Sequence, residues 1–295
     1  MKSLRSLFLA LGFLSLAVAA QAQITVDLSL KQRFYLLHEP VIATAILTNQ
    51  TGRDITFSDT DQYQWFGFRV TAPGDQIVAP RDLHYKVPPL TVKAGETVKR
   101  SINLTQLYEL DDFGTYRVQA TIYFDGLDKF FASRPAYIEE TEGRVIWSKA
   151  AGVPEGQPGA GQTRTFSLLS HQRGEVNTLY VRVTGMDDGM VYCTYPIGRL
   201  LDGVPIQAEF DSNNNLYVLQ LNGTRAYVLT KVNNDGQFGG QTNYSAPTTR
   251  PTLRKTAEGG LQIIGGHREI ASNQPLAPAD IPKLSARPPG LPVDH

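Results

Sequence analysis

The sequence predicts an all-β fold, and three observations support that prediction. Short runs rich in Val, Ile, Thr, Tyr and Phe recur along the chain, and turn residues separate them. No segment shows a convincing helical period. The pattern divides into two parts, an N-terminal β-sandwich and a C-terminal antiparallel β-meander domain with blade-like repeats.

The first residues have the features of a secretory signal peptide. Lys2 and Arg5 precede an apolar run from Leu7 to Ala20, and Ala20-Gln21-Ala22 fits a signal peptidase site. The apolar run is shorter than the ~20 residues that a membrane span needs. We therefore expect residues 1–22 to be removed and the protein to be exported to the periplasm, the cell surface or the extracellular space. No membrane span is expected after this cleavage.

Residues 23–143 are expected to form the sandwich. They carry about seven β-rich runs in about 120 residues, which is typical of two packed antiparallel sheets. The expected strands are Ile24–Leu30, Val41–Thr48, Asp54–Phe57, Trp65–Thr71, Thr97–Leu104, Gly114–Phe124 and Lys129–Ile138.

One motif in this segment indicates a particular kind of sandwich. The run Asp112–Val118 (DFGTYRV) resembles the D-x-G-x-Y-x-C run of immunoglobulin-like domains. In that fold the Tyr hydroxyl bonds to the backbone upstream, an arrangement called the tyrosine corner. Val118 replaces the second disulfide cysteine, and Trp65 is a candidate core tryptophan. The resemblance implies a disulfide-free bacterial immunoglobulin-like domain, which is a fold and not a function.

A linker and a second β domain are expected to follow. Lys149 to Gln162 (KAAGVPEGQPGAGQ) is rich in Gly, Pro, Ala and Gln, so residues 144–162 are assigned as a linker. The strand-like Arg144–Ser148 fits either side of the boundary. Residues 163–271 form the second domain, and residues 272–295 form a Pro-rich tail in which no regular structure is expected.

The second domain contains a weak internal repeat. The similar three-residue runs Leu179-Tyr180-Val181, Leu216-Tyr217-Val218 and Leu261-Gln262-Ile263 recur at spacings of 37 and 45 residues. This resembles the blades of a β-propeller, although three copies are fewer than the four to eight of a closed ring. A small barrel and an open sheet remain alternatives, because any antiparallel meander produces such a pattern. Turns are expected at Asp211–Asn215, Asn222-Gly223 and Asn233–Gly236.

Composition excludes some classes of function. Without Lys2 and Arg5 the chain has 26 basic and 28 acidic residues, a net charge of −2, which argues against nucleic-acid binding. Cys193 is the only cysteine, so no intrachain disulfide forms, and on a predicted strand it is expected to be a buried small hydrophobe.

Recognisable catalytic equipment is absent from the sequence. No nucleophile elbow, phosphate-binding loop or metal-ligand spacing of histidines occurs. Asp211–Asn215 matches the first half of a calcium loop, but Leu216 and Asn222 replace the Gly and Glu that such a loop needs. We therefore expect a hairpin turn there, and no catalytic residue, metal site or cofactor is predicted.

Aromatic residues are the best candidates for binding. Tyr63, Trp65 and Phe66 lie close together, and neighbouring residues of a strand face opposite sides, so one of the pair Trp65 and Phe66 is expected to be exposed. The sequence thus favours an exported, non-catalytic binding or scaffold protein that recognises a protein or a glycan. An exported hydrolase acting on a polymer and a structural component of the cell envelope are the alternatives.

Overall fold

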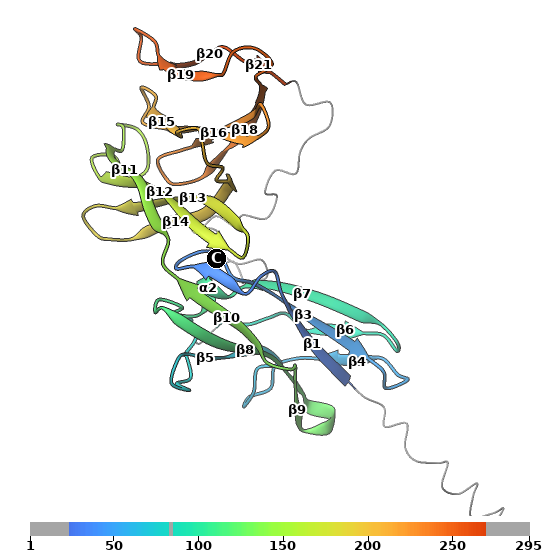
Figure 1. Ribbon diagram of the computed structural model, residues 1–295. Helices are drawn as coiled ribbons and strands as arrows, with labels where there is room; N and C mark the ends of the chain where they lie inside the picture. Colours follow the sequence, from blue (N-terminus) through green and yellow to red (C-terminus); the bar gives the residue numbers. More distant parts are fainter. Residues whose placement is uncertain (1–23, 83–84, 270–295) are drawn as a thin grey trace, which may run out of the picture.

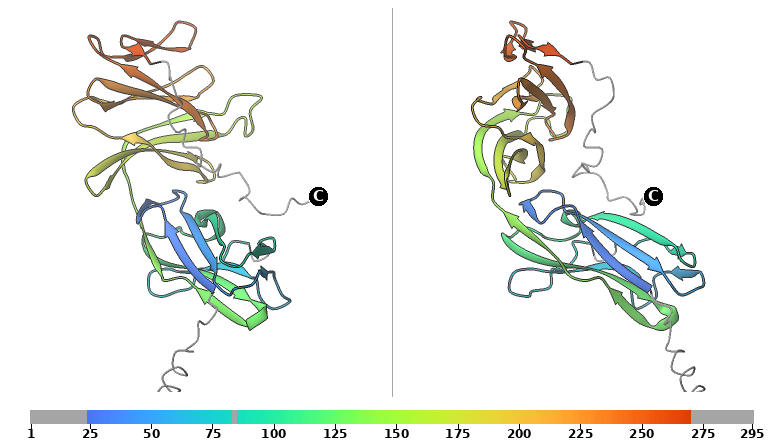
Figure 2. Two further views of the ribbon diagram at one scale, coloured as in Figure 1. Left: turned by 90° about the vertical axis from the view of Figure 1, so that its right-hand side faces the viewer. Right: turned by 45° about the vertical axis from the view of Figure 1, so that its right-hand side comes forward.

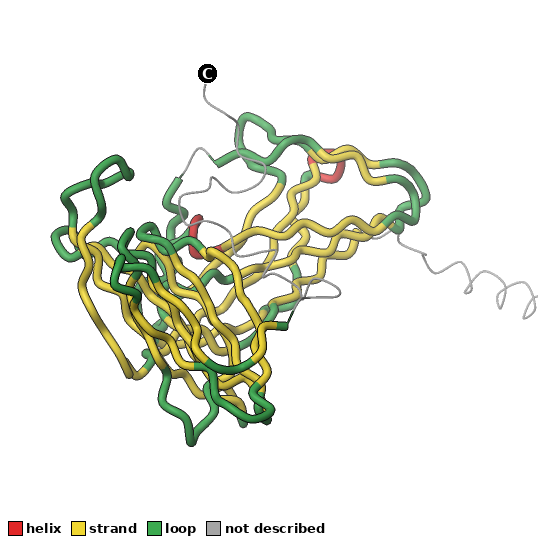
Figure 3. Tube along the Cα trace, turned by 90° about the horizontal axis from the view of Figure 1, so that it is seen from above, coloured by secondary structure: helices red, strands yellow, loops and turns green. Residues whose placement is uncertain are grey.

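The computed structural model (Figure 1) describes residues 24–82 and 85–269. The predicted signal peptide and the Pro-rich tail lie outside the described residues. Nearly all regular structure is β-strand (Figure 3), which confirms the all-β prediction. The strands form two lobes (Figure 2), an N-terminal lobe of residues 24–141 and a C-terminal lobe of residues 144–269.

Two main sheets face each other in the N-terminal lobe. One has the order β1-β3-β7; the other has the order β2-β10-β8-β5, with β9 paired to β8, and β4 and β6 form a separate pair. Strands β2 and β10 run parallel. The elements are β1 Ile24–Leu30, β2 Phe34–Leu36, β3 Ile42–Asn49, β4 Ile55–Phe57, β5 Phe66–Thr71, β6 Leu90–Val92, β7 Thr97–Asn103, α2 Leu104–Leu107, β8 Gly114–Phe124, η2 Asp125–Leu127, β9 Lys129–Ala132 and β10 Ala136–Thr141.

Alternating burial explains how these strands build a core. Along β3 every second side chain is buried, including Ala43, Ala45 and Leu47, because successive side chains of a strand point to opposite faces. Strand β8 has the same alternation, with Tyr116 and Val118 among its buried residues. The two inward faces form one hydrophobic cluster that extends from Ile24 to Ile138.

The hydrogen bond that the D-x-G-x-Y motif predicts is present. The Tyr116 hydroxyl donates to the Asp112 carbonyl oxygen at 3.0 Å and accepts from the Asp112 N–H at 3.0 Å. Val118 and Trp65 are both buried in the core. These contacts fix the start of β8 against the turn that precedes it.

Several predicted strands differ in their extent. Lys129–Ile138 was predicted as one strand, but Ser133, Arg134 and Pro135 interrupt it, since Pro lacks the N–H that a strand ladder needs. The three-residue strands β2 and β6 were not predicted, because runs this short show no period. The helix α2 was not predicted either; its N-cap Asn103 accepts a hydrogen bond from the Thr105 N–H.

Three sheets follow one another in the C-terminal lobe. Their orders are β11-β12-β13-β14, β15-β16-β17-β18-β21 and β19-β20. One hydrophobic cluster joins the first two sheets, and a second cluster joins the last two, so the sheets are stacked (Figure 1). The strands are β11 Arg144–Gly152, β12 Thr163–Arg173, β13 Val176–Gly185, β14 Val191–Arg199, β15 Gln207–Phe210, β16 Leu216–Gly223, β17 Ala226–Val232, β18 Phe238–Ser245, β19 Thr252–Lys255, β20 Leu261–Ile264 and β21 His267–Arg268.

The linker prediction for residues 144–162 is wrong in its extent. Residues 144–152 form β11, which pairs with β12, and the Gly- and Pro-rich remainder is the loop between these two strands. Only Glu142 and Gly143 separate β10 from β11. Composition could not show this, because a long hairpin loop and a domain linker use the same residue types.

The predicted turns of the C-terminal lobe have different outcomes. Asp211–Asn215 is the expected hairpin turn, in which the Asp211 carboxylate accepts from the N–H groups of Asn213 and Asn215. The turn expected at Asn222-Gly223 lies two residues later, at Thr224 and Arg225, because β16 continues to Gly223. Cys193 is buried in the core, as predicted.

Candidate binding surface

Two of the three predicted binding residues are buried. Trp65 is 1% exposed and Phe66 is 3% exposed, so the expectation that one of this pair faces solvent is wrong. Trp65 precedes β5, and its indole N–H donates to the Val87 carbonyl oxygen at 3.0 Å. Because the chain before β5 need not follow strand alternation, both rings can enter the same core.

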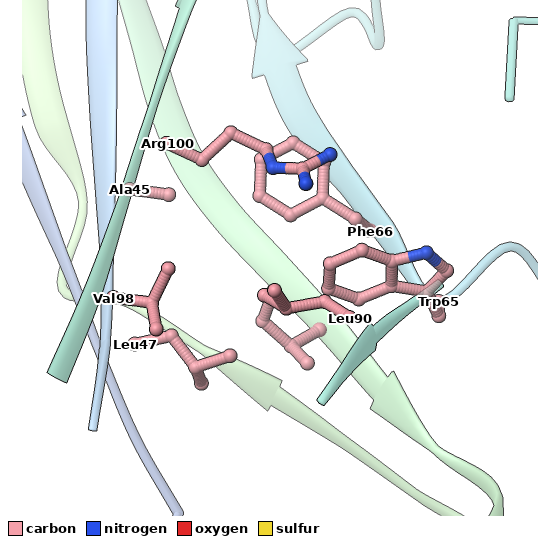
Figure 4. A pocket seen from close by; sticks show the side chains of 8 residues that line it. Ala45, Leu47, Trp65, Phe66, Leu90, Val98 and Arg100 are labelled. Atoms are coloured by element: carbon pink, nitrogen blue, oxygen red, sulfur yellow. The ribbon is translucent and has the colours of Figure 1, made fainter. Parts of the chain in front are cut away.

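Trp65 and Phe66 line a small pocket between the sheets (Figure 4). Its other lining residues are mainly aliphatic, and the space is enough for about one water molecule. The guanidinium of Arg100, on the edge strand β7, lies 5.5 Å from the Trp65 ring centre and 5.8 Å from that of Phe66. Burial lowers the pKa of Arg100. An inward-pointing charge of this kind discourages a further strand from pairing with an edge.

Tyr63 is the exposed member of the predicted set. Its side chain is 42% exposed, and it packs against Tyr123 and Phe130. The ring centres are 4.8 Å apart for Tyr63 and Tyr123, 5.2 Å for Tyr63 and Phe130, and 4.9 Å for Tyr123 and Phe130. Phe130 is 51% exposed. We call these three residues the aromatic platform.

Local structure holds each ring of the aromatic platform. Tyr63 closes a tight turn in which its N–H donates to the Thr60 hydroxyl at 3.0 Å. Tyr123 and Phe130 are directly paired across β8 and β9. Their chain neighbours Ile122 and Phe131 pack in the core, so strand alternation places the two rings on the outer face of the sheet.

The turn between β8 and β9 anchors the middle ring. The Tyr123 hydroxyl donates to the Asp128 carboxylate at 2.9 Å. This hydrogen bond, together with burial and the charges of Asp128 and Asp125, raises the pKa of Tyr123 to about 12. Asp128 has a φ of 45°, a left-handed conformation that Asp tolerates better than most residues. The platform is therefore preorganised.

The platform suits stacking rather than reaction chemistry. Exposed aromatic faces can pack against sugar rings or the apolar groups of a partner protein. Tyr63 was predicted as a binding residue, but Tyr123 and Phe130, which are 60 or more residues away in the chain, were not. Their alternation with core residues on β8 and β9 was a usable signal, once those two runs are paired as a hairpin.

Several exposed or partly exposed acidic residues of the N-terminal lobe form ion pairs with arginines. Asp111 and Glu109 both lie near Arg81, at 3.0 and 3.9 Å, and Glu139 pairs with Arg33 at 3.8 Å. Burial raises the pKa of Glu140, which is 2% exposed and lies on the same face of β10 as the core residue Ile138. A polymer chain cannot reach this buried carboxyl group.

Comparison with known proteins identifies no family for this chain. The described residues hold no group of three or more His, Cys, Asp or Glu side chains that could bind a metal ion. They also contain no helix that is long and apolar enough to cross a membrane. No family model matches the chain, and no curated protein matches it.

Proposed function

We propose that this chain is an exported, non-catalytic binding protein that recognises a glycan or a protein of the cell envelope through the aromatic platform. The observation that carries the proposal is the packing of Tyr63, Tyr123 and Phe130 into one partly exposed cluster on an outer sheet face. Soluble proteins bury most aromatic surface, so two half-exposed rings held against the buried Tyr123 indicate a contact surface.

The architecture of the N-terminal lobe supports a binding module. Its two facing sheets, the parallel pairing of β2 with β10 and the Tyr116–Asp112 hydrogen bonds support the proposal that it is an immunoglobulin-like sandwich without a disulfide. Such sandwiches carry many functions, so the function must come from the surface itself. The stacked sheets of the C-terminal lobe support a propeller-like or solenoid-like arrangement.

The proposal is tested by capture on envelope material. The mature chain and the variants Tyr63→Ala and Phe130→Ala are incubated with a washed envelope fraction, before and after protease digestion. Phe113→Ala is the matched control, because Phe113 is a similarly exposed aromatic residue, at 55%, outside the platform. We expect both platform variants to lose capture and the control to keep it.

Protease digestion separates the two classes of ligand. Capture that survives digestion indicates a glycan, and capture that is lost indicates a protein. Equal capture of all variants would show that the aromatic platform is not the binding surface. Hydrolysis of an envelope polymer by the purified chain would favour the enzyme alternative instead.

A further inference from the structure

The sheet face that carries the aromatic platform continues beyond the platform. Strands β5, β8 and β10 lie side by side in this sheet, and β9 extends it at the platform end (Figure 1). Along β8 every second residue from Tyr116 to Ile122 is buried in the core, so the residues between them point outward. Going back along β8 from Tyr123, the outward residues are Thr121, Gln119 and Arg117, and all three are partly exposed.

The residues directly beside the aromatic platform are small. Gly67 on β5 and Ala132 on β9 are the register partners of Thr121 on its two sides. A Cβ atom at Gly67 would meet only the Thr121 hydroxyl within 4 Å, at 3.7 Å, and Ala132 is exposed. No large side chain of these three positions rises above the sheet, so a ligand stacked on the platform can continue along the face.

The next row of the face offers polar groups. Arg69 on β5 lies directly opposite Gln119 on β8, and Arg69 is exposed. The Gln119 amide nitrogen donates to the Ser133 carbonyl oxygen at 3.1 Å, which holds this side chain in place. No carboxylate among the described residues forms an ion pair with Arg69. The middle of the face therefore presents a positive charge without a counter-charge.

A second exposed aromatic ring lies at the far end of the face. Tyr137 on β10 is 50% exposed and is the register partner of Arg117. Arg117 pairs with the exposed Asp75 at 3.7 Å. Six residues of β8 separate Arg117 from Tyr123, so the row of Tyr137 and the row of the aromatic platform are about 20 Å apart along the sheet.

We propose that this outer sheet face binds a linear glycan that carries carboxylate groups. The inference rests on the proposed function and adds the class of ligand to it. Sugar rings stack on exposed aromatic rings, and aromatic residues at both ends of an open face fit a chain of sugars better than a single one. The guanidinium of Arg69 has the charge and the planar donors that bind a carboxylate.

The charges on the face place the acidic group of the glycan. Asp125 and Asp128 lie close enough to Tyr123 to act on its hydroxyl group, so the platform end of the face is negative. A carboxylate of the ligand would be repelled there and attracted at Arg69. We therefore expect uncharged parts of the sugar chain on the platform and on Tyr137, with a carboxylate between them.

The probe for this proposal is the washed envelope fraction after protease digestion. One half is left untreated, and the carboxyl groups of the other half are converted to amides with carbodiimide and ammonia. Capture of the mature chain over a range of envelope concentrations gives an apparent Kd for wild type, Tyr137→Ala and Arg69→Glu. Phe113→Ala is the control for the first variant. Arg254→Glu is the control for the second, because Arg254 is an exposed strand residue of the other lobe and its replacement changes the net charge equally.

We expect both face variants to bind the untreated fraction more weakly. Tyr137→Ala should raise the apparent Kd about 2- to 12-fold, the range for an aromatic contact. Arg69→Glu should raise it about 2- to 30-fold, because an exposed attraction becomes a repulsion of similar size. Both controls should match wild type. Amidation should weaken capture of wild type and of Arg254→Glu, and it should strengthen capture of Arg69→Glu.

The failures of the two proposals are distinguishable. If Tyr63→Ala and Phe130→Ala lose capture but Tyr137→Ala and Arg69→Glu match wild type, the extended glycan face is overturned and the proposed function stands. Equal capture of all variants overturns both. An equal response of Arg69→Glu and Arg254→Glu to amidation overturns the carboxylate contact. Capture that disappears on protease digestion identifies a protein partner and overturns the glycan.

Discussion

Arg173 of the C-terminal lobe and Glu39 of the N-terminal lobe form an ion pair across the contact between the two lobes. In the chain, 134 residues separate them. The Glu39 side chain is 7% exposed and that of Arg173 is 20% exposed. A second hydrogen bond from Arg173 to Gln32, at 2.8 Å, extends the contact, and Gln32 also donates to Glu39. The pair therefore belongs to a small network that both lobes complete.

This network predicts a large effect of removing one partner. Arg173→Gln leaves Glu39 buried without its counter-charge, which typically costs about 3–5 kcal/mol of unfolding free energy. The double variant with Glu39→Gln should recover part of the loss, because no charge is then stranded. Urea unfolding of the two single variants and the double variant measures the coupling. Additive losses would show that the pair contributes nothing as a pair.

Glu140→Gln is predicted to stabilise the protein at neutral pH. The folded-state pKa of Glu140 is raised from 4.5 to about 9, so the folded state keeps a proton that the unfolded state has released. This contribution is complete below pH 4.5 and is lost as pH rises toward 9, with a cost of order 3 kcal/mol at pH 7. The variant should gain stability relative to wild type as the pH is raised from 5 to 8 in urea unfolding. A stability difference between Glu140→Gln and wild type that stays constant over that pH range would contradict the raised pKa of Glu140.

His38 is predicted to respond to acid in the opposite sense. Burial lowers its pKa, followed by the charge of Arg182, while Asp111 acts to raise it. The folded state therefore releases a proton that the unfolded state binds, and this contribution to stability declines as the pH falls below 6.5. His38→Asn should be less sensitive to acid, and it suits the φ of 66° at this position. Melting temperatures at pH 7.5 and 5.5 check this expectation, and an unchanged acid sensitivity would count against it.

The glycine between the lobes predicts a steric effect. Gly143→Ala places a methyl group against Leu36 and Leu169 and should cost about 1–3 kcal/mol. Gly152→Ala is the matched control, because nothing lies within 4 Å of its Cβ position. Thermal unfolding of both variants makes the comparison. Equal melting temperatures of Gly143→Ala and Gly152→Ala would mean that Leu36 and Leu169 can shift to make room for the methyl group at no cost in stability.

The sequence was informative where a local signal and the tertiary contact agree. Val41–Thr48 alternates strongly, and β3 lies there with one buried face. The DFGTYRV run predicted the Tyr116–Asp112 contact, because the interaction spans four residues. Turns with an Asn or Asp side chain that bonds its own backbone, as at Asp211, were also recognisable.

Long-range arrangement could not be predicted in the same way. Nothing near Glu39 indicates that Arg173 will meet it, and Trp65 and Phe66 gave no sign that both enter one core. Strand β18 was not predicted, because its sequence, FGGQTNYS, is polar and rich in Gly. Its extended conformation is fixed by pairing with β17. The aromatic platform needed the β8–β9 pairing before Phe130 could be placed beside Tyr63.

The most direct test of the proposed function is the affinity of the aromatic platform for the ligand that the capture experiment isolates. The double variant Tyr63→Ala/Phe130→Ala should bind about 5- to 150-fold more weakly than the wild-type chain, since each exposed ring contributes about 0.5–1.5 kcal/mol. Isothermal titration calorimetry with Phe113→Ala as the control measures this ratio. An affinity of the double variant equal to that of wild type and control would contradict the account.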